Sequence, residues 1–151
     1  VIINDINKEK VNKISKKYKA KIFSDQNFYD LDVDIYAPCA LGSTLNPFTI
    51  NRLKCSVVAG AANNQLEDEL RDSELLMKKG VLYAPDFLIN AGGLINVYSE
   101  LNGYDKDAAL KQTSDIYNTT LNIFKTSEVE KINTHVTALK IAQERINKNK
   151  K

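Results

Sequence analysis

The sequence has few cysteines, little net charge and no long apolar run, and each of these absences excludes a class of protein. Two cysteines, Cys39 and Cys55, form neither a CxxC pair nor a disulfide-rich framework. This favours a reducing, intracellular setting, and we expect the cytoplasm. No apolar run approaches the roughly 18–20 residues that a membrane span requires. With 21 basic and 19 acidic side chains the net charge is +2, which gives no general reason to expect nucleic acid binding.

Histidine is scarcer still. The single histidine, His135, falls in the C-terminal helical part, and we interpret it as a packing or solvated residue rather than a catalyst. No spacing of His, Cys, Asp or Glu is typical of a metal site, so no metal is predicted. The lysines between residues 8 and 21 are interrupted by apolar residues at helical spacing. We interpret this stretch as a solvated helix face rather than a nucleic-acid patch.

An initiator methionine is also absent. The chain opens on the apolar residues Val1-Ile2-Ile3, without the basic segment of a signal peptide. We therefore expect a piece cut from a longer protein. Its 151 residues, 43% of them hydrophobic and 26% charged, have the composition of one ordinary globular domain.

The order of the predicted elements is typical of an α/β protein. Short apolar runs predict strands over residues 1–3, 21–23, 33–37, 55–60 and 81–84. Helical periodicity predicts helices over residues 8–18, 47–53 and 67–79. Gly80 is the expected terminator of the third helix. Continuously apolar strands that alternate with helices predict a parallel sheet covered on both faces.

After about residue 90 the alternation stops and the pattern is helical. We expect helices over residues 91–101, 106–124 and 134–147, which form a helical extension over about 91–151. The residues expected to face inward are Leu110, Tyr117, Leu121 and Phe124 on the long helix, Leu139, Ala142 and Ile146 on the last, and Val11, Ile14 and Tyr18 on the first.

Asp5, at the end of the first predicted strand, allows two interpretations. In a dinucleotide-binding unit, a carboxylate here accepts hydrogen bonds from the adenine-ribose hydroxyls and repels a 2′-phosphate. Alternatively, Asp5 only helps Asn7 to cap the next helix. The first interpretation requires a GxGxxG turn roughly 20 residues upstream, which would lie before Val1.

Three polar or small-residue loops follow successive predicted strands. Residues 38–42 are small and contain Gly42, residues 59–65 include three consecutive amides, and residues 90–93 place two glycines at a helix start. Because parallel strands end at one edge of their sheet, these loops are expected to converge where open α/β sheets bind ligands. Amides suit an uncharged carboxamide or a carboxylate ligand.

Residues 34–42, 58–66 and 83–97 strongly resemble the amino-acid dehydrogenases of the glutamate/leucine/phenylalanine/valine group, and look closest to its leucine-acting members. The segment 4–7 matches the second Rossmann strand of that family. The resemblance implies a Rossmann-like parallel sheet with helices on both faces and its first strand missing, a partial NAD(P)-binding domain over residues 1–151. It also implies oxidative deamination of an L-amino acid to a 2-oxo acid and ammonia, and homo-oligomers.

Carried over position by position, the resemblance implies NAD as the cofactor. The cofactor-binding residues would be Asp5, Ile6, Cys39, Ala40, Leu41 and Asn63, and the substrate-binding residues would be Asn90, Leu94 and Val97. Because Leu94 and Val97 are aliphatic, the pocket favours a branched aliphatic side chain over a carboxylate. Phenylalanine stays an open alternative, as does valine.

The resemblance also implies which parts of the family's catalytic unit lie outside this sequence. The catalytic lysine and aspartate of the family lie in an N-terminal domain outside this sequence, as do the Gly-rich loop and the first strand. We therefore expect no catalytic residue here and an inactive chain on its own. We expect the gap in the sheet to be closed by movement of the second Rossmann strand, by another copy or by local disorder. A non-catalytic interaction or regulatory module is the alternative function.

Overall fold

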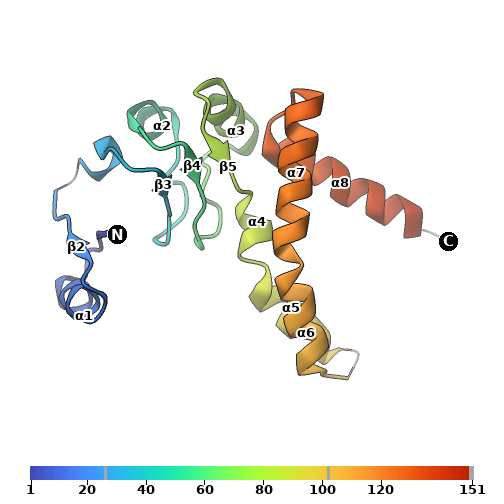
Figure 1. Cartoon of the computed structure of the whole chain (residues 1–151). Coiled ribbons are helices and arrows are strands. Elements are labelled where there is room, and N and C mark those ends of the chain that lie inside the picture. The colour runs from blue at the N-terminus through green and yellow to red at the C-terminus, as the bar shows by residue number, and fades with distance from the viewer. Residues whose placement is uncertain (26, 102, 150–151) are drawn as a thin grey trace.

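The computed structural model of the chain describes residues 1–25, 27–101 and 103–149. Short parallel strands and helices alternate through the first part, and helices alone follow (Figure 1). The alternating elements are β1 (Ile2–Ile3), α1 (Lys8–Tyr18), β2 (Lys21–Ile22), the 3-10 turn η1 (Phe28–Asp30), β3 (Ile35–Tyr36), α2 (Pro47–Arg52), β4 (Val57–Val58), α3 (Glu69–Lys78) and β5 (Leu82–Tyr83). The helical elements are α4 (Asp86–Ile89), α5 (Gly92–Glu100), α6 (Lys106–Ser114), α7 (Ile116–Glu130) and α8 (Thr134–Asn149). The predicted alternation is confirmed, and α4 is an additional element.

The described strands form two parallel sheets. β1 pairs with β2, and β3, β4 and β5 pair in that order. Within the described residues β1 makes no ladder with β3, so the expectation that the strand moves across to close the sheet is wrong. Figure 1 shows α1 and β2 to one side of β3. We call residues 1–25 the first unit, and residues 33–84 the second unit.

Arg52 holds the segment between the two units, which includes η1, against α2. Its guanidinium donates to both carboxylate oxygens of Asp30, at 3.0 and 2.6 Å, and to the side chain of Asn27 at 2.9 Å. The hydrogen bond from Arg52 holds the pKa of the Asp30 carboxyl below its usual value. The rings of Tyr29 and Tyr36 pack edge to face beside this pair. This small contact fixes the segment between the units to the second unit.

The hydrophobic core belongs to the second unit. Its buried members come from β4, β5, α2, α3 and the segments between them: Leu45, Ile50, Leu53, Cys55, Val58, Leu66, Leu76, Val81 and Tyr83. In the first unit, of the three residues expected to face inward, only Val11 is buried, whereas Ile14 and Tyr18 are exposed. The core therefore stabilises the loops that follow β3, β4 and β5.

The predicted helix over residues 106–124 is two helices that meet at Asp115. The reason is local, because Thr113 and Ser114 bond back to carbonyls of their own helix and Asp115 accepts from the Asn118 side chain. Such side-chain bonds compete with a continuous helix. Leu110 and Tyr117 are exposed, Leu121 and Phe124 are half-buried, and the buried residues are Ala109 and Ile123.

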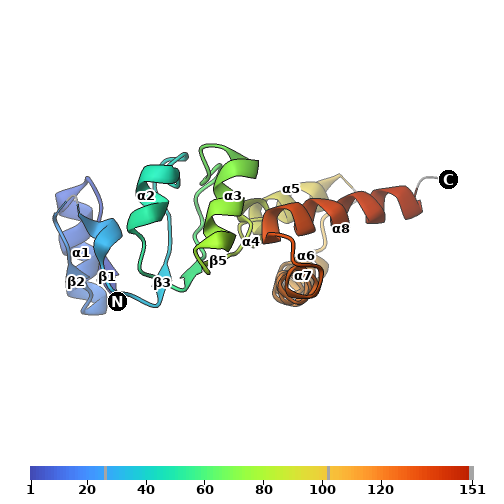
Figure 2. The ribbon, with the colours of Figure 1, turned by 90° about the horizontal axis from the view of Figure 1, so that it is seen from above.

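The inward face of α8 was also predicted wrongly. Leu139, Ala142 and Ile146 are exposed, and burial is confined to residues 133–138. Only the beginning of α8 lies against the body of the protein, and its remaining turns extend away toward the C-terminus (Figure 2). His135 lies in the buried part, with its ring 5.6 Å from that of Phe87. The packing role predicted for this histidine is confirmed.

Candidate functional site

The loops after β3 and β4 are joined by backbone hydrogen bonds at the carboxyl end of the sheet. The Ala62 amide donates to the Pro38 carbonyl at 2.9 Å, and the Ser43 amide donates to the Asn64 carbonyl at 2.6 Å. Gly60 makes this approach feasible, since a Cβ there would lie 2.1 Å from the Pro38 oxygen. The predicted convergence of these two loops is confirmed.

The loop after β5 joins them through side chains. Asn90, which caps the C-terminus of α4, donates from Nδ2 to Oδ1 of Asn63 at 2.5 Å and to the Ala61 carbonyl at 3.4 Å. The Asn63–Asn90 contact leaves amide donors and a carbonyl oxygen at a surface reached by solvent. Two residues predicted on separate loops are therefore brought together, in a form suited to an uncharged polar ligand.

Two further residues, Gln65 and Asp86, lie behind this contact. The sequence analysis expected Gln65, the last of three consecutive amides, to be available to a ligand, and this is wrong because its side chain is buried under the loop. Asp86 was missed. Gln65 is fully buried and donates from Nε2 to the carbonyls of Gly60 and Ala62, at 2.7 and 2.9 Å. Asp86 is buried, and its carboxylate accepts from the backbone amide of Gln65 at 2.8 Å. The available signal was an Asp directly after a proline, which is typical of a helix start.

The predicted substrate residues continue from this loop onto α5. Leu94 and Val97 are 71% and 61% exposed, so they lie on the surface and the described residues do not enclose them in a pocket. A Cβ on Gly92 would touch Thr113 of α6 at 3.3 Å, whereas one on Gly93 would have no neighbour within 4 Å. Packing against the described chain therefore accounts for Gly92 and not for Gly93, where the open backbone is accessible to a ligand.

Asp5 lies apart from these loops, at the end of β1. Its Oδ1 accepts from the Asn7 amide at 2.8 Å, and Asn7 in turn caps α1 by accepting from the Lys10 amide at 2.9 Å. The structure thus contains the hydrogen bond that the helix-capping interpretation of Asp5 predicts. Asp5 and the fully exposed Ile6 also line a depression of about 560 Å³, together with Phe23 and Phe28.

Cys39, Ala40 and Leu41 follow β3 and are all exposed, Leu41 to 85%. Their exposure leaves a small, largely apolar surface beside the Asn63 loop, to which Gly42 is closely fitted. Cys39 is a free thiol.

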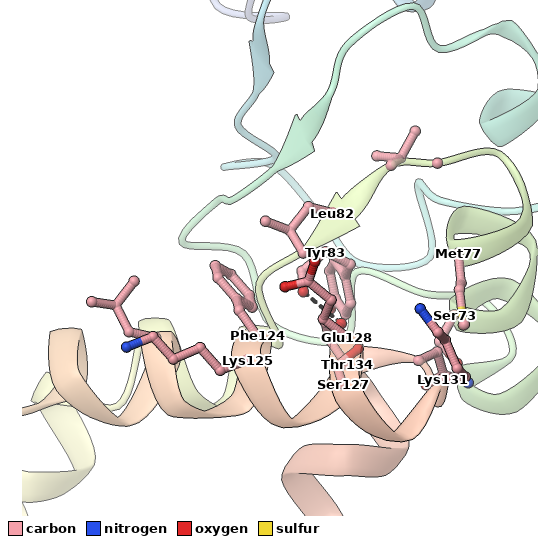
Figure 3. Close-up of a pocket in the computed structure, with 14 residues that line it drawn as sticks. Ser73, Met77, Leu82, Tyr83, Phe124, Lys125, Ser127, Glu128, Lys131 and Thr134 are labelled. Carbon is pink, nitrogen blue, oxygen red and sulfur yellow. Dashed lines mark hydrogen bonds between the residues drawn. The ribbon is translucent and has the colours of Figure 1, made fainter.

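A second cavity, of about 410 Å³, lies between α3, the β5 segment and α7 (Figure 3). Its lining includes Leu82, Phe124 and Lys125 and none of the predicted site residues. The Thr134 hydroxyl donates to the Tyr83 carbonyl at 2.6 Å. Burial raises the pKa of Tyr83. Thr134 thus holds the start of α8 against β5, and we assign this cavity to helix packing.

Neither a metal cluster nor a membrane helix is found over residues 1–25, 27–101 and 103–149. No three His, Cys, Asp or Glu side chains come together there to hold an ion. None of the helices in those ranges has the length and apolar character needed to cross a membrane.

Parallel βα units with their ligand-type loops gathered at the carboxyl ends of the strands define a Rossmann-like α/β protein. A sequence model of the glutamate/leucine/phenylalanine/valine dehydrogenase family matches residues 2–151. The chain belongs to this family.

Two relatives are similar over nearly the whole chain. An L-tryptophan dehydrogenase of Nostoc punctiforme is 46% identical over 151 residues, which are all of this chain and 43% of the relative. A leucine dehydrogenase of Thermoactinomyces intermedius is 45% identical over 146 residues, 97% of this chain and 40% of the relative. The chain thus spans less than half the length of these relatives.

The fold agrees with a solved member of the family. The crystal structure of the L-tryptophan dehydrogenase from Nostoc punctiforme matches with a TM-score of 0.94 and 47% identity, over 98% of this chain and 45% of that one. Because the match covers 98% of this chain, it extends across both units.

Proposed function

We propose that this chain is the NAD-binding part of an amino-acid dehydrogenase, which converts an L-amino acid to a 2-oxo acid and ammonia. The observation that carries the proposal is the Asn63–Asn90 contact at the carboxyl edge of the sheet, in a chain of this family. Close to this contact in the sequence, a Cβ on Gly93 would have no neighbour within 4 Å, so the backbone there is open. A retained ligand site accounts for both.

The residues present fit a dinucleotide. The depression lined by Asp5 and Ile6 offers a carboxylate and an apolar wall to the adenosine end, and the loop from Cys39 to Leu41 offers small and aliphatic surface. The Asp5 carboxylate would accept from ribose hydroxyls and repel a 2′-phosphate, which favours NAD over NADP. Bound NAD would supply the acceptor for the hydride that leaves Cα of the amino acid.

Within this scheme the described residues bind and orient. Asn63 would hold the nicotinamide ribose, and Asn90 would orient the substrate or the carboxamide through its carbonyl and amide. We assign no proton transfer to this chain. The lysine and aspartate expected for that role belong to a preceding domain, so the 151 residues alone should be inactive.

For the substrate we propose leucine or another branched-chain amino acid, because Leu94 and Val97 offer an aliphatic surface without a partner for a carboxylate. An aromatic substrate, tryptophan or phenylalanine, is the second candidate. It is favoured by a tryptophan dehydrogenase as similar as the leucine enzyme, at 46% against 45% identity.

The test is a substrate panel on the full-length protein encoded by the gene. Reduction of NAD is followed with leucine, valine, phenylalanine, tryptophan and glutamate, each also with NADP. We expect the highest kcat/KM with leucine and NAD, and at least tenfold less with glutamate. A preference for tryptophan would move the assignment to the second candidate. No turnover with any amino acid would favour the non-catalytic module.

A further inference from the structure

We propose that Gln65 and Asp86 together position Asn63 and Asn90 for the reaction, without touching ligand themselves. This inference rests on the function proposed above. The two residues, here called the Gln65–Asp86 pair, lie directly behind the Asn63–Asn90 contact and link the loops that carry it.

Asp86 holds two loops with one carboxylate. Its Oδ2 accepts from the Gln65 amide of the β4–α3 loop at 2.8 Å, and its Oδ1 accepts from the Phe87 amide at 2.6 Å, at the start of α4. Because α4 is a single turn, the Asp86 carbonyl also accepts from the Asn90 amide at 3.1 Å. The position of Asp86 therefore determines where the Asn90 side chain begins.

The Gln65 side chain shapes the other loop. Its Nε2 donates to Gly60 and Ala62, so that the segment between them and Gln65 is closed around a fully buried amide with Asn63 on the outside. Oε1 of Gln65 has no hydrogen-bond partner among the described residues. A buried carbonyl without a partner costs stability. We therefore infer that the Gln65 side chain serves to shape the loop rather than to stabilise the fold.

The chemistry of the Gln65–Asp86 pair leaves little freedom for substitution. Both carboxylate oxygens of Asp86 face N–H donors, so an asparagine would turn its own NH₂ toward one of them. That loop or α4 would have to shift, and a displacement of the order of 1 Å at reacting groups costs up to about 10²-fold in rate. We expect the substitution to lower kcat because Asn63 or Asn90 is displaced.

The experiment compares Asp86→Asn with Asp72→Asn in the full-length protein. Asp72 is the control: it is a buried carboxylate that accepts a backbone amide at a helix start, from Asp68 at 2.8 Å, and it is additionally paired with Arg71, but α3 carries no site residue. We expect Asp86→Asn to lower kcat about 10- to 100-fold. Asp72→Asn should lower the melting temperature at least as much and leave kcat within twofold.

A double-mutant cycle separates positioning from general damage. If Asp86 acts through Asn90 and Asn63, then Asp86→Asn combined with Asn90→Ala lowers kcat by clearly less than the product of the two single effects. Multiplying effects, an unchanged kcat in Asp86→Asn, or an equal loss in Asp72→Asn would overturn the inference. If Asp86→Asn fails to fold, Gln65→Glu takes its place, since it sets a carboxylate oxygen against the Gly60 and Ala62 carbonyls and leaves the bonds of Asp86 intact.

A readout without activity distinguishes this inference from the proposed function. Hydrogen exchange of the Gln65 and Ala62 amides should accelerate at least tenfold in Asp86→Asn and stay unchanged in Asp72→Asn. If the wild-type protein turns over no amino acid, the proposed function fails, and the exchange data still decide whether the Gln65–Asp86 pair fixes the loops. Unchanged exchange in Asp86→Asn would overturn it.

Discussion

The two units of the chain are built from the same βαβ pattern but differ in what holds them. The second unit buries nine side chains in one cluster, including Leu45, Ile50 and Leu76, each at most 1% exposed. The first unit buries only Val11 and Ala20, and its strands β1 and β2 are partly or largely exposed.

The comparison shows that pattern alone does not make a stable unit. A βαβ element is stabilised when neighbouring strands and helices cover its apolar residues. In the second unit this cover comes from α2, α3 and the helices after β5. The loops that carry Asn63 and Asn90 therefore rest on a rigid base, whereas Asp5 lies on the less supported unit.

The largest expected difference is in the cost of removing a buried valine. Val58→Ala in β4 should lower the free energy of unfolding by about 2–3 kcal/mol, because the surrounding cluster cannot collapse around the cavity. Val11→Ala in α1 should cost only about 1 kcal/mol. Urea unfolding of the two variants measures this difference, and equal losses would refute the contrast between the units.

The second prediction is that kcat depends on Asn90, whose loop rests on the second unit. In the full-length protein, Asn90→Ala should lower kcat roughly 10²-fold, because a group that orients the reactants is lost. Asn51→Ala, an exposed asparagine of α2, is the control and should behave as wild type. Steady-state kinetics test this. A change in KM alone would mean that Asn90 binds the substrate and the transition state equally and does not orient the reaction.

The third prediction places cofactor choice in the first unit. Asp5→Ser should raise the KM for NAD roughly tenfold and reduce the preference for NAD over NADP, with kcat little changed. The serine can still accept from the Asn7 amide and keep the start of α1 in place. If cofactor kinetics are unaffected, Asp5 has only the capping role.

The smallest effect concerns the segment between the units. Arg52 lowers the pKa of Asp30, so the pair stabilises the folded state above the usual carboxyl pKa, and this contribution is lost as the pH falls through the lowered value. Arg52→Leu should therefore lower the urea midpoint at pH 7 and come closer to wild type at about pH 3. A gap that stays constant with pH would exclude the ion pair as its cause.

The sequence predicted what depends on local pattern, and missed what depends on neighbours in space. The order of strands and helices, the cap at Asn7 and the left-handed Gly80 after α3 follow from periodicity and residue chemistry. The exposure of Leu139 and Ile146 on α8 could not be predicted, because the apolar spacing does not show whether another element covers that face.

The candidate site shows the same division. Asn63 and Asn90 were singled out because polar residues follow predicted strands, and the parallel sheet brings them together. Gln65 was wrongly expected to be available to a ligand and Asp86 was missed, because their roles are set by burial and by hydrogen bonds between loops about 20 residues apart in the sequence. Before the fold is known, a buried glutamine has the same local pattern as an exposed one.

The most direct test of the central claim is to follow the hydrogen on Cα. The full-length protein is incubated with NAD and L-leucine that carries deuterium at Cα, and the reduced cofactor is analysed by mass spectrometry. An amino-acid dehydrogenase transfers that deuterium, so the reduced cofactor should be one mass unit heavier than with unlabelled leucine. Reduced cofactor without the label, or no reduction with any L-amino acid, would contradict the account.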